Sequence, residues 1–327
     1  MKRRPGHSRI HAGLTRDRAL IGTAYLGDPQ LRSEYTREIA PRTRAALARI
    51  LTQLGPRLSG VRRVLDLGAG TGAAGAAVRA HLGDDVTVVS VDQVAAAPGV
   101  IVADLRREVR PRGVEGRFDL IVAAHVLNEL GAKLTIVQRA ALVFAWAREL
   151  LEEGGLLLLL EPALRETGRD LLGVRDRMIE AGYTVVAPCF WQGACPALVR
   201  ERDWCHDSAP WLLPTGDEAV AGEAAPRPAN RSRVDYAYVV LTRTAERSSD
   251  KRLFRIVSDP MEEKGRLRLF GCGPAGRHAL VRLDRERNDD NRDFDAATRG
   301  DVVVISTVET AGDGLRITGA SRVDRRG

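Results

Sequence analysis

The sequence lacks any apolar run that approaches the ~20 residues needed to span a bilayer as a helix. The leucine run at 156–160 is far shorter and predicts a buried strand. The N-terminus is basic, but no apolar segment of a secretory signal follows it, and no amphipathic transit helix is evident. We therefore expect a monomeric protein of the bacterial cytoplasm with no membrane partner.

Closely spaced cysteine pairs are also missing. The C-x2–4-C knuckles of zinc ribbons and the C-x2-C runs of ferredoxins do not occur. There are four cysteines, and three of them fall within 17 residues: Cys189, Cys195, Cys205 and Cys272. Without a secretory signal, this grouping favours a metal site over disulfides.

The identity of that metal stays open from the spacing alone. Four thiolates suit either tetrahedral zinc or a four-iron cluster, and the loose spacing favours the larger cluster slightly. His206 follows Cys205 and could replace Cys272 as the fourth ligand. The alternative without a metal is that the cysteines are small buried hydrophobic residues.

The chain is organised around a glycine-rich segment at 64–72, Val-Leu-Asp-Leu-Gly-Ala-Gly-Thr-Gly. It predicts a buried strand, a tight turn and a helix over 73–82. Such a unit offers backbone N–H groups and a helix N-terminus to a ligand. Glycines at 68, 70 and 72 allow close approach, and we predict that Gly68, Gly70 and Gly72 bind a cofactor.

Two cofactors compete for this turn. Gly68-x-Gly70-x-x-Ala73 loosely fits the fingerprint of NAD-binding proteins. However, Asp66 precedes the first glycine by two residues, where it would repel a pyrophosphate and suit the cationic groups of S-adenosylmethionine. This favours S-adenosylmethionine over NAD, and over a purely structural turn.

Two further acidic residues follow predicted strands. Asp92 lies 24 residues after Gly68, where a carboxylate can bind ribose hydroxyls. Asp104 follows residues 101–103 and could meet the adenine, or it could cap a helix that begins at Leu105. Asp66, Asp92 and Asp104 complete the predicted cofactor site.

The segment at 61–165 alternates between strand and helix patterns, which implies a parallel sheet covered on both faces. A helix at 170–181 and a strand at 183–187 continue the pattern. A strand at 236–242 would close the sheet. The expected fold class is α/β, with a Rossmann-like class I methyltransferase sheet. We predict strands at 62–67, 86–91, 100–103, 118–123 and 156–161, with helices near 73–82 and 134–152.

Other segments flank this predicted domain, which we place at 61–245. Residues 1–60 form a basic helical segment in which 1–14 look disordered and Pro41 divides two helices. A cysteine-rich insertion occupies 188–234, and its part at 215–234 reads as a flexible loop. Residues 244–252 read as a linker. Short β runs over 251–327 suggest a small antiparallel barrel, resembling an oligonucleotide-binding fold.

Charge is unevenly distributed along a chain whose net charge is +7. Residues 1–60 hold 12 Lys and Arg against 4 Asp and Glu, and residues 251–327 hold 16 against 13. Two basic ends around a mildly acidic middle suit a polyanion such as RNA, although a basic tail can also be merely solvated.

The sequence carries no Asn/Asp-Pro-Pro-aromatic motif, which in many amino-directed nucleic-acid methyltransferases cradles a flipped base. The stretch in its place is residues 123–126, Ala-Ala-His-Val. His125 could act as a general base, or it could simply line the ligand site or the core. Cys189 after Pro188 suggests a cytosine-directed nucleophile, but it follows the sixth strand rather than the fourth or fifth.

Several segments together resemble the methyltransferase-like family associated with the small ribosomal subunit, best known from its mitochondrial members. The most specific is the run Ala187-Pro-Cys, Ala194-Cys-Pro and Asp203-Trp-Cys-His; the glycine segment, Val126-Leu-Asn-Glu-Leu, Leu160-Glu-Pro and residues 238–243 add to it. The resemblance covers about residues 30–310. Two stretches depart from the pattern: the segment after His206 is less basic, and 215–234 is degenerate.

The resemblance implies an S-adenosylmethionine domain, a [4Fe-4S] cluster and a role in small-subunit assembly on ribosomal RNA. It implies that the cluster ligands are Cys189, Cys195, Cys205 and Cys272. We therefore expect a methyltransferase that acts on ribosomal RNA. The alternatives are a non-catalytic RNA-binding assembly factor with a structural metal site such as zinc, and an NAD-dependent oxidoreductase.

Overall fold

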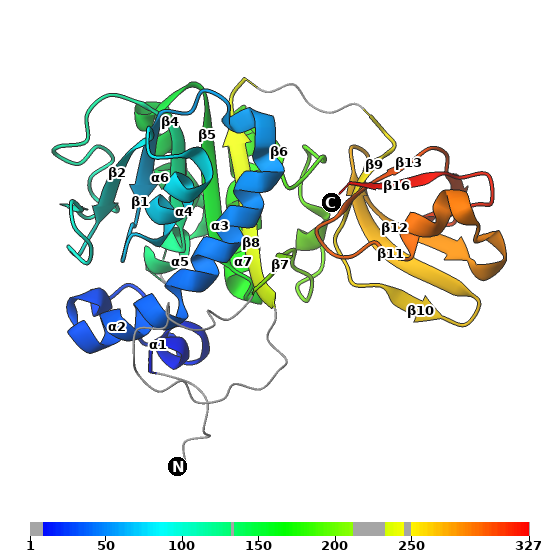
Figure 1. Cartoon of the computed structure of the whole chain (residues 1–327), viewed down its shortest axis with the longest axis horizontal. Helices are drawn as coiled ribbons and strands as arrows, with labels where there is room; N and C mark the ends of the chain where they lie inside the picture. The colour runs from blue at the N-terminus through cyan, green and yellow to red at the C-terminus, as the bar shows by residue number, and fades with distance from the viewer. Residues whose placement is uncertain (1–8, 132–133, 212–232, 245–249, 327) are drawn as a thin grey trace, which may run out of the picture.

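The computed structural model describes residues 9–131, 134–211, 233–244 and 250–326. Two β-sheets, one in each of two parts of the chain, dominate the structure (Figure 1). The predicted flexible loop at 215–234 falls mostly outside the described residues, as does the central portion of the linker at 244–252. None of the described helices is both long and apolar enough to cross a membrane.

The first sheet has the strand order β3-β2-β1-β4-β5-β8-β6, with β7 paired to β8. Strands β1 to β5 are parallel, and β8 runs antiparallel to β5 and β6. The expected α/β sheet is confirmed. Its strands are β1 (Arg63–Leu67), β2 (Thr87–Asp92), β3 (Ile101–Val102), β4 (Phe118–Ala124), β5 (Leu151–Pro162), β6 (Thr184–Ala187), β7 (Asp207–Pro210) and β8 (Arg233–Thr242).

Helices cover both faces of this sheet. α3 (Ala40–Leu54) and α4 (Ala73–Leu82) pack on one face, and α6 (Ile136–Leu150) and α7 (Arg165–Glu180) pack on the other. Alternate residues of β4 point into these two cores: Ile121 faces α6, whereas Leu120 faces α3. A sheet buried on both faces explains why its strands read as nearly continuous apolar runs.

Local capping sets where the helices begin. The Asp28 side chain accepts hydrogen bonds from the backbone N–H groups of Gln30 and Leu31 at the start of α2 (Pro29–Glu38). Thr135 and Gln138 form a capping box at the start of α6. Pro41 lies in the first turn of α3, so the predicted division into two helices is confirmed.

Residues 9–38 lie beside the first sheet, where Figure 1 labels α1 and α2. The expectation that 1–14 is disordered is wrong for residues 9–14. These residues form α1 (Arg9–His11) and the start of a π-helical turn (Ala12–Arg16). Ile10 is fully buried in an apolar cluster with Tyr25, Leu31 and Tyr35, which the sequence spacing did not reveal.

The second sheet has the order β14-β15-β12-β11-β9-β13-β16, with β10 paired to β11. The expected barrel is wrong, because its end strands β14 and β16 are short and do not pair with each other among the described residues. Strand β15 also runs parallel to β12, so the sheet is not purely antiparallel. Its strands are β9 (Leu253–Ile256), β10 (Met261–Glu263), β11 (Arg266–Gly273), β12 (Gly276–Leu283), β13 (Val302–Ile305), β14 (Glu309–Ala311), β15 (Gly314–Ile317) and β16 (Val323–Arg326).

Candidate cofactor pocket and thiol cluster

A pocket of about 680 Å³, part of it open to solvent, lies beyond the carboxyl ends of β1 to β4. This is where open parallel sheets bind ligands. The walls come from the glycine turn, from the ends of β2, β3 and β4, and from the N-terminal residues Thr23 to Leu26 together with Tyr35.

The glycine turn is shaped for close approach. Gly68 and Gly70 line the pocket with φ values of +72° and +52°, in the left-handed region that favours glycine. A Cβ on Gly68 would lie 2.3 Å from Cγ2 of Val126. Gly72 shares the positive φ, at +82°, and forms the N-cap of α4, but it is not among the pocket-lining residues.

The carboxylate of Asp66 lies behind the turn rather than in the pocket wall. Its Oδ2 accepts a hydrogen bond from the Gly75 N–H at 3.0 Å, and its Oδ1 is buried without a partner. Burial raises the pKa of Asp66 to about 7. Asp66 therefore fastens the strand to α4 and adds negative potential beneath the glycine turn, instead of touching a ligand as its position in the sequence suggested.

Asp92 is placed as predicted, in the pocket wall at the end of β2. Its Oδ2 accepts from the Gly70 N–H at 2.9 Å and its Oδ1 from the Val94 N–H at 3.0 Å. Burial raises its pKa. Asp92 thus holds the glycine turn in shape and at the same time presents a carboxylate to the pocket.

Asp104 also lines the pocket, but its carboxylate is hydrogen-bonded to the guanidinium of Arg106. Both of its oxygens accept from the Arg106 guanidinium at 2.9 Å, and Oδ1 accepts from the Arg106 N–H at 3.0 Å. The hydrogen bond from the Arg106 side chain lowers the pKa of Asp104. No helix begins at Leu105, so the alternative of a helix cap is wrong: the carboxylate closes a turn instead.

The sequence interpretation missed two pocket residues, Glu129 and Tyr25. Glu129 ends the short helix α5 (Val126–Glu129) after β4, and its Oε1 accepts from the Tyr25 hydroxyl at 2.8 Å. Burial raises the pKa of Glu129 to about 7. Glu129 belongs to the motif Val126-Leu-Asn-Glu-Leu, and its position after β4 could have marked it as a pocket residue. Nothing in the sequence links Tyr25 to Glu129.

His125 lines the pocket with an unusual backbone, at φ +64°. Its Nε2 lies 3.2 Å from the Thr43 hydroxyl, and its Nδ1 is buried without a partner. Burial lowers the pKa of His125 to about 4, so the ring is neutral at pH 7. This favours a ligand-lining role over that of a base that titrates near neutral pH.

The pocket and its surroundings are rich in buried carboxylates. Asp66, Asp92 and Glu129 form no ion pair with a cationic side chain in the described part of the chain. Burial raises the pKa of these carboxyl groups, so a bound cation would favour their charged forms, whereas a pyrophosphate would meet only further negative charge. The electrostatics of the folded chain therefore agree with the choice of S-adenosylmethionine over NAD.

These buried acids predict the pH dependence of stability. Burial raises the pKa of Asp66 and Glu129 to about 7 and that of Glu161 to about 8, well above the values of the unfolded chain. The unfolded chain has already lost these protons at pH 6.5, while the folded chain still binds them. Stability must therefore fall as pH rises from 6.5 to 8.5, by at most about 1.4 kcal/mol per pH unit for each group.

Below pH 6.5 the buried His125 has the opposite effect on stability, because its imidazole binds a proton in the unfolded chain but stays neutral in the folded chain. His125 is one group against three carboxyl groups whose pKa values in the unfolded chain lie near 4, so the melting temperature of the ligand-free protein should be highest below about pH 5 and should fall from there to about pH 8. Glu161→Gln should flatten the alkaline slope. A stability that rises between pH 6.5 and 8.5 would contradict these assignments.

The four cysteines come together at the junction between the two sheets. Three lie between β6 and β7, and Cys272 lies on β11 of the second sheet. Burial and then the neighbouring thiols raise the pKa of Cys195 to about 12 and that of Cys205 to about 11. Burial and the three other thiols also raise the pKa of Cys272, so the four share one neighbourhood.

Helix α7 holds the cysteine-bearing loop in place. Arg169 donates to the backbone carbonyls of Ala197, Arg200 and Asp203 at 3.1, 2.8 and 2.7 Å. Arg175, which is 1% exposed, donates to the carbonyls of Trp191 and Gly193. The carboxylate of Asp176 accepts from the Cys195 N–H at 2.8 Å. The loop is therefore a fixed part of the fold.

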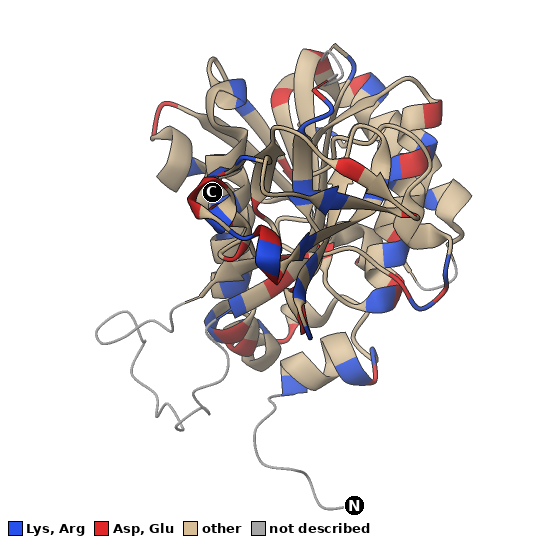
Figure 2. Ribbon diagram, turned by 90° about the vertical axis from the view of Figure 1, so that its right-hand side faces the viewer, with Lys and Arg blue, Asp and Glu red and all other residues tan. Residues whose placement is uncertain are grey.

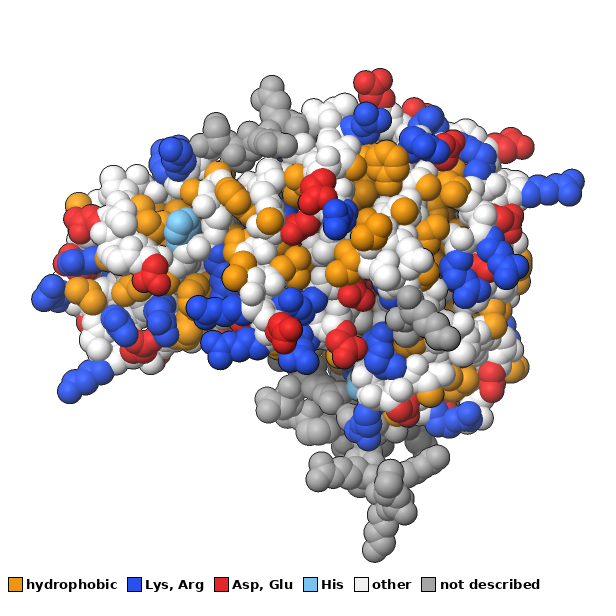
Figure 3. Space-filling view, turned by 180° about the vertical axis from the view of Figure 1, so that it is seen from behind, with side chains coloured by type: hydrophobic (Ala, Val, Ile, Leu, Met, Phe, Trp, Pro, Cys, Tyr) orange, Lys and Arg blue, Asp and Glu red, His pale blue; other side chains and the backbone are white. Residues whose placement is uncertain are grey.

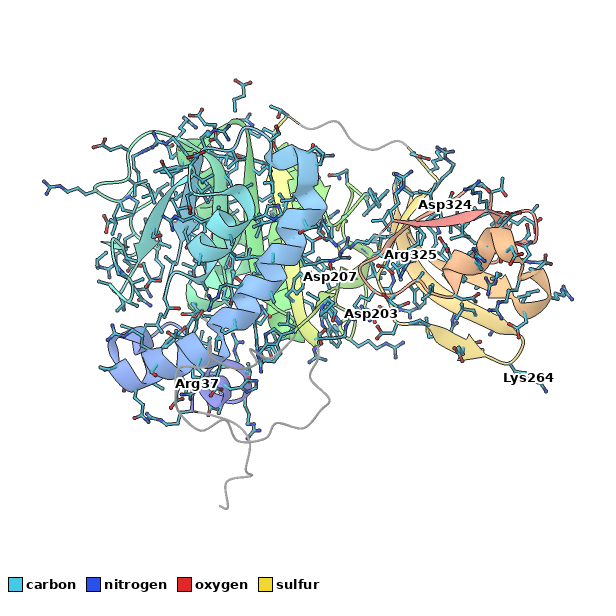
Figure 4. The ribbon with its side chains drawn as sticks, in the orientation of Figure 1. Arg37, Asp203, Asp207, Lys264, Asp324 and Arg325 are labelled. Atoms are coloured by element: carbon cyan, nitrogen blue, oxygen red, sulfur yellow. The ribbon has the colours of Figure 1, made fainter. Side chains whose placement is uncertain are left out.

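Two ion pairs beside the thiols join the cysteine-bearing segment to the second sheet. Asp207 pairs with Arg255, both buried, and Asp203 pairs with Arg277 at 3.4 Å. Cys205 lies between the two acids in sequence, and Cys272 stands opposite Arg255 and Arg277 in the register of the second sheet. Figure 4 shows Asp203 and Asp207 in this region between the sheets.

The four thiols lie near one another but are not arranged as metal ligands. No group of three or more His, Cys, Asp or Glu side chains within the described ranges is arranged to hold a metal ion. The residue types and their convergence suit a thiolate-bound cluster, but the four side chains do not form a coordination sphere. His206 stacks on Trp204 with ring centroids 5.7 Å apart, and burial lowers its pKa.

Basic and acidic side chains are mixed over the surface. Figure 2 shows them interspersed on the side that carries the second sheet, and Figure 3 shows a group of Lys and Arg near the junction between the two parts. A second cavity of about 1480 Å³, partly open, is lined from both parts of the chain, by residues that include Trp211, Arg233 and Arg299.

The strand order and the pocket define a protein with a Rossmann-like methyltransferase fold. A family profile described as mitochondrial small ribosomal subunit Rsm22 matches residues 32–287. This match extends over most of the chain, and the protein belongs to that family. No curated protein matches the chain.

Solved methyltransferases resemble the chain more distantly. The plantazolicin methyltransferase BpumL in complex with SAH shares 16% identity at a TM-score of 0.34, with 46% of this chain and 60% of that chain covered. An O-methyltransferase family protein from Burkholderia thailandensis shares 18% identity at a TM-score of 0.36, with 49% and 57% covered. The chain thus spans less than two thirds of either protein.

Proposed function

We propose that this protein binds S-adenosylmethionine in the pocket beyond β1 to β4. The carrying observation is a set of three buried carboxyl groups that form no ion pair within the described residues, Asp66, Asp92 and Glu129, around a glycine turn shaped for close approach. Gly68, Gly70, Asp92 and Asp104 would contact the ligand, while Asp66 and Gly72 would support the turn. When bound, this cofactor supplies an electrophilic methyl group.

We further propose that the protein acts on small-subunit ribosomal RNA, either by methylating it or by assisting its assembly. Family membership supports the ribosomal particle as partner. The basic residues at 1–60 and the cavity lined by Arg233, Arg299 and Trp211 support contact with a polyanion. The division of the strands into two sheets supports 61–245 and 251–327 as separate domains.

Methylation and assembly without catalysis remain two versions of this function. The pocket-lining His125 is neutral, and no base-cradling motif follows β4, which supports the non-catalytic version. In a deletion strain rescued by the wild type or by Asp66→Ala, a methyl mark on ribosomal RNA that requires Asp66 would establish catalysis. Rescue of assembly without any mark would establish the non-catalytic version.

We also propose that Cys189, Cys195, Cys205 and Cys272 hold a [4Fe-4S] cluster, with zinc as the alternative metal. The convergence of three thiols from the loop between β6 and β7 with one from the second sheet supports this, and the side chains would have to rearrange to complete the site. A cluster there would supply a covalent link between the two sheets.

Protein purified without oxygen should contain about four irons and four sulfides per chain. Cys189→Ser and Cys272→Ser should each lose them, although Cys189 lies in the loop between β6 and β7 and Cys272 lies on β11 of the second sheet. Ser208→Ala, close to the loop but outside the thiol set, should keep them. One zinc per chain, or no metal, would refute the cluster.

Association with the ribosomal particle tests the partner. We expect the purified chain to sediment with small ribosomal subunits at low salt and to dissociate as salt rises, because phosphate contacts release counterions. Failure to sediment with small subunits at any salt concentration would exclude the ribosomal role for this chain.

A further inference from the structure

The outer wall of the cofactor pocket comes from the N-terminus of the chain. Residues 9–38, from α1 through α2, form a segment that we call the strap. It contributes Thr23, Ala24, Tyr25, Leu26 and Tyr35 to the pocket lining. The facing wall lies about a hundred residues later in the chain, at the end of β4 and in α5.

The strap is fastened to the pocket by a few polar contacts. The Tyr25 hydroxyl donates to Glu129 Oε1 at 2.8 Å, and Arg18 Nη2 donates to Asn128 Oδ1 at 2.6 Å. Gln93 Nε2 donates to the carbonyl of Thr23 at 3.2 Å. Two of these contacts therefore engage the polar side chains of α5, directly beside the pocket.

The strap also seals the glycine turn. A Cβ on Gly70 would lie 3.3 Å from Cδ1 of Leu26, so the leucine packs against the turn itself. A Cβ on Gly22 would lie 3.5 Å from the carbonyl oxygen of Glu129, so the backbone of the strap passes close to α5. The strap therefore covers the pocket on the side of the glycine turn and of α5.

Two features of the strap, its own apolar cluster and the break at Ile39, would allow it to move as a unit. Its apolar cluster is built mainly from its own residues, including Ile10, Leu14, Leu31 and Tyr35, and touches the rest of the fold through small side chains such as Ala73. Ile39 separates α2 from α3 and serves as the C-cap of one and the N-cap of the other, which makes it the natural pivot.

We propose that the strap is a lid that opens and closes over the cofactor pocket, with the Tyr25–Glu129 hydrogen bond as its latch. The latch also positions Glu129, so that a bound cation meets a fixed carboxylate. This inference rests on the proposed binding of S-adenosylmethionine.

Amide hydrogen exchange and ligand dissociation test the lid in the full chain. Saturating S-adenosylmethionine should slow exchange over residues 9–38. Tyr25→Phe should raise the dissociation rate about tenfold, because one hydrogen bond to a charged group is lost. Tyr236→Phe is the matched control, since its hydroxyl is buried without a partner outside the pocket, and its dissociation rate should equal that of the wild type.

A double-mutant cycle distinguishes the positioning of Glu129 by Tyr25 from a general loss of structure. In a Glu129→Gln background, Tyr25→Phe should have a much smaller further effect on dissociation, while the melting temperature of the ligand-free variants stays similar. Binding that leaves exchange over 9–38 unchanged, with Tyr25→Phe behaving as the wild type, would overturn the lid. Absence of any binding would refute the proposed cofactor first, and the lid with it.

Discussion

Gly68→Ala should weaken S-adenosylmethionine binding at least tenfold, or about 1.4 kcal/mol. Alanine at φ +72° is strained by roughly 1–2 kcal/mol, and its Cβ would lie 2.3 Å from Cγ2 of Val126. The turn and the start of α5 must therefore separate, and both line the pocket. Calorimetric titration of the variant measures the loss.

Gly83→Ala is the matched control for backbone strain. Gly83 has φ +92° at the end of α4, and a Cβ there would meet nothing within 4 Å. This variant should lose a similar amount of stability through strain but keep its affinity. If the two variants bind equally well, the glycine turn does not contact the ligand.

Asp207→Ala should destabilise the folded protein by about 3–5 kcal/mol, because it leaves a buried guanidinium without its partner. The side chains of Asp207 and Arg255 are only 5% and 8% exposed. Arg255 reaches Asp207 from β9 of the second sheet, so the loss should loosen the junction that brings the thiols together. Chemical denaturation followed by two probes, one in each part, measures it.

Asp324→Ala removes an acid from an ion pair with Arg322 whose side chains are 51% and 67% exposed. Figure 4 labels both acids, one at the junction and one at the outer strand β16. An exposed pair contributes at most about 1 kcal/mol, so this control should be nearly neutral. Equal effects from the two variants would mean that the junction is not held by Asp207.

The sequence correctly predicted those elements whose formation depends mainly on residues close together in the chain. The range 73–82 for α4 agrees with the structure, because a glycine turn precedes it and a glycine with positive φ ends it. The strands that form the centre of the first sheet were also found, since burial on both faces leaves uninterrupted apolar runs. Asp92 was placed correctly because parallel strands bring their ends to one edge.

What the sequence could not supply depends on contacts between distant residues. Tyr25 reaches Glu129 across more than a hundred residues, and no local pattern encodes that pairing. Asp66 has the expected strand position, but its carboxylate turns toward Gly75 rather than the pocket. The short strands β10, β14 and β16 carry little periodicity, so the second sheet was mistaken for a barrel.

Calorimetric titration of the ligand-free wild-type chain with S-adenosylmethionine, and separately with NADH, tests the central claim most directly. The buried carboxylates around the glycine turn predict binding of S-adenosylmethionine and no binding of NADH. Binding of NADH alone would contradict the account, because a pyrophosphate would then lie beside the buried carboxyl groups of Asp92 and Glu129.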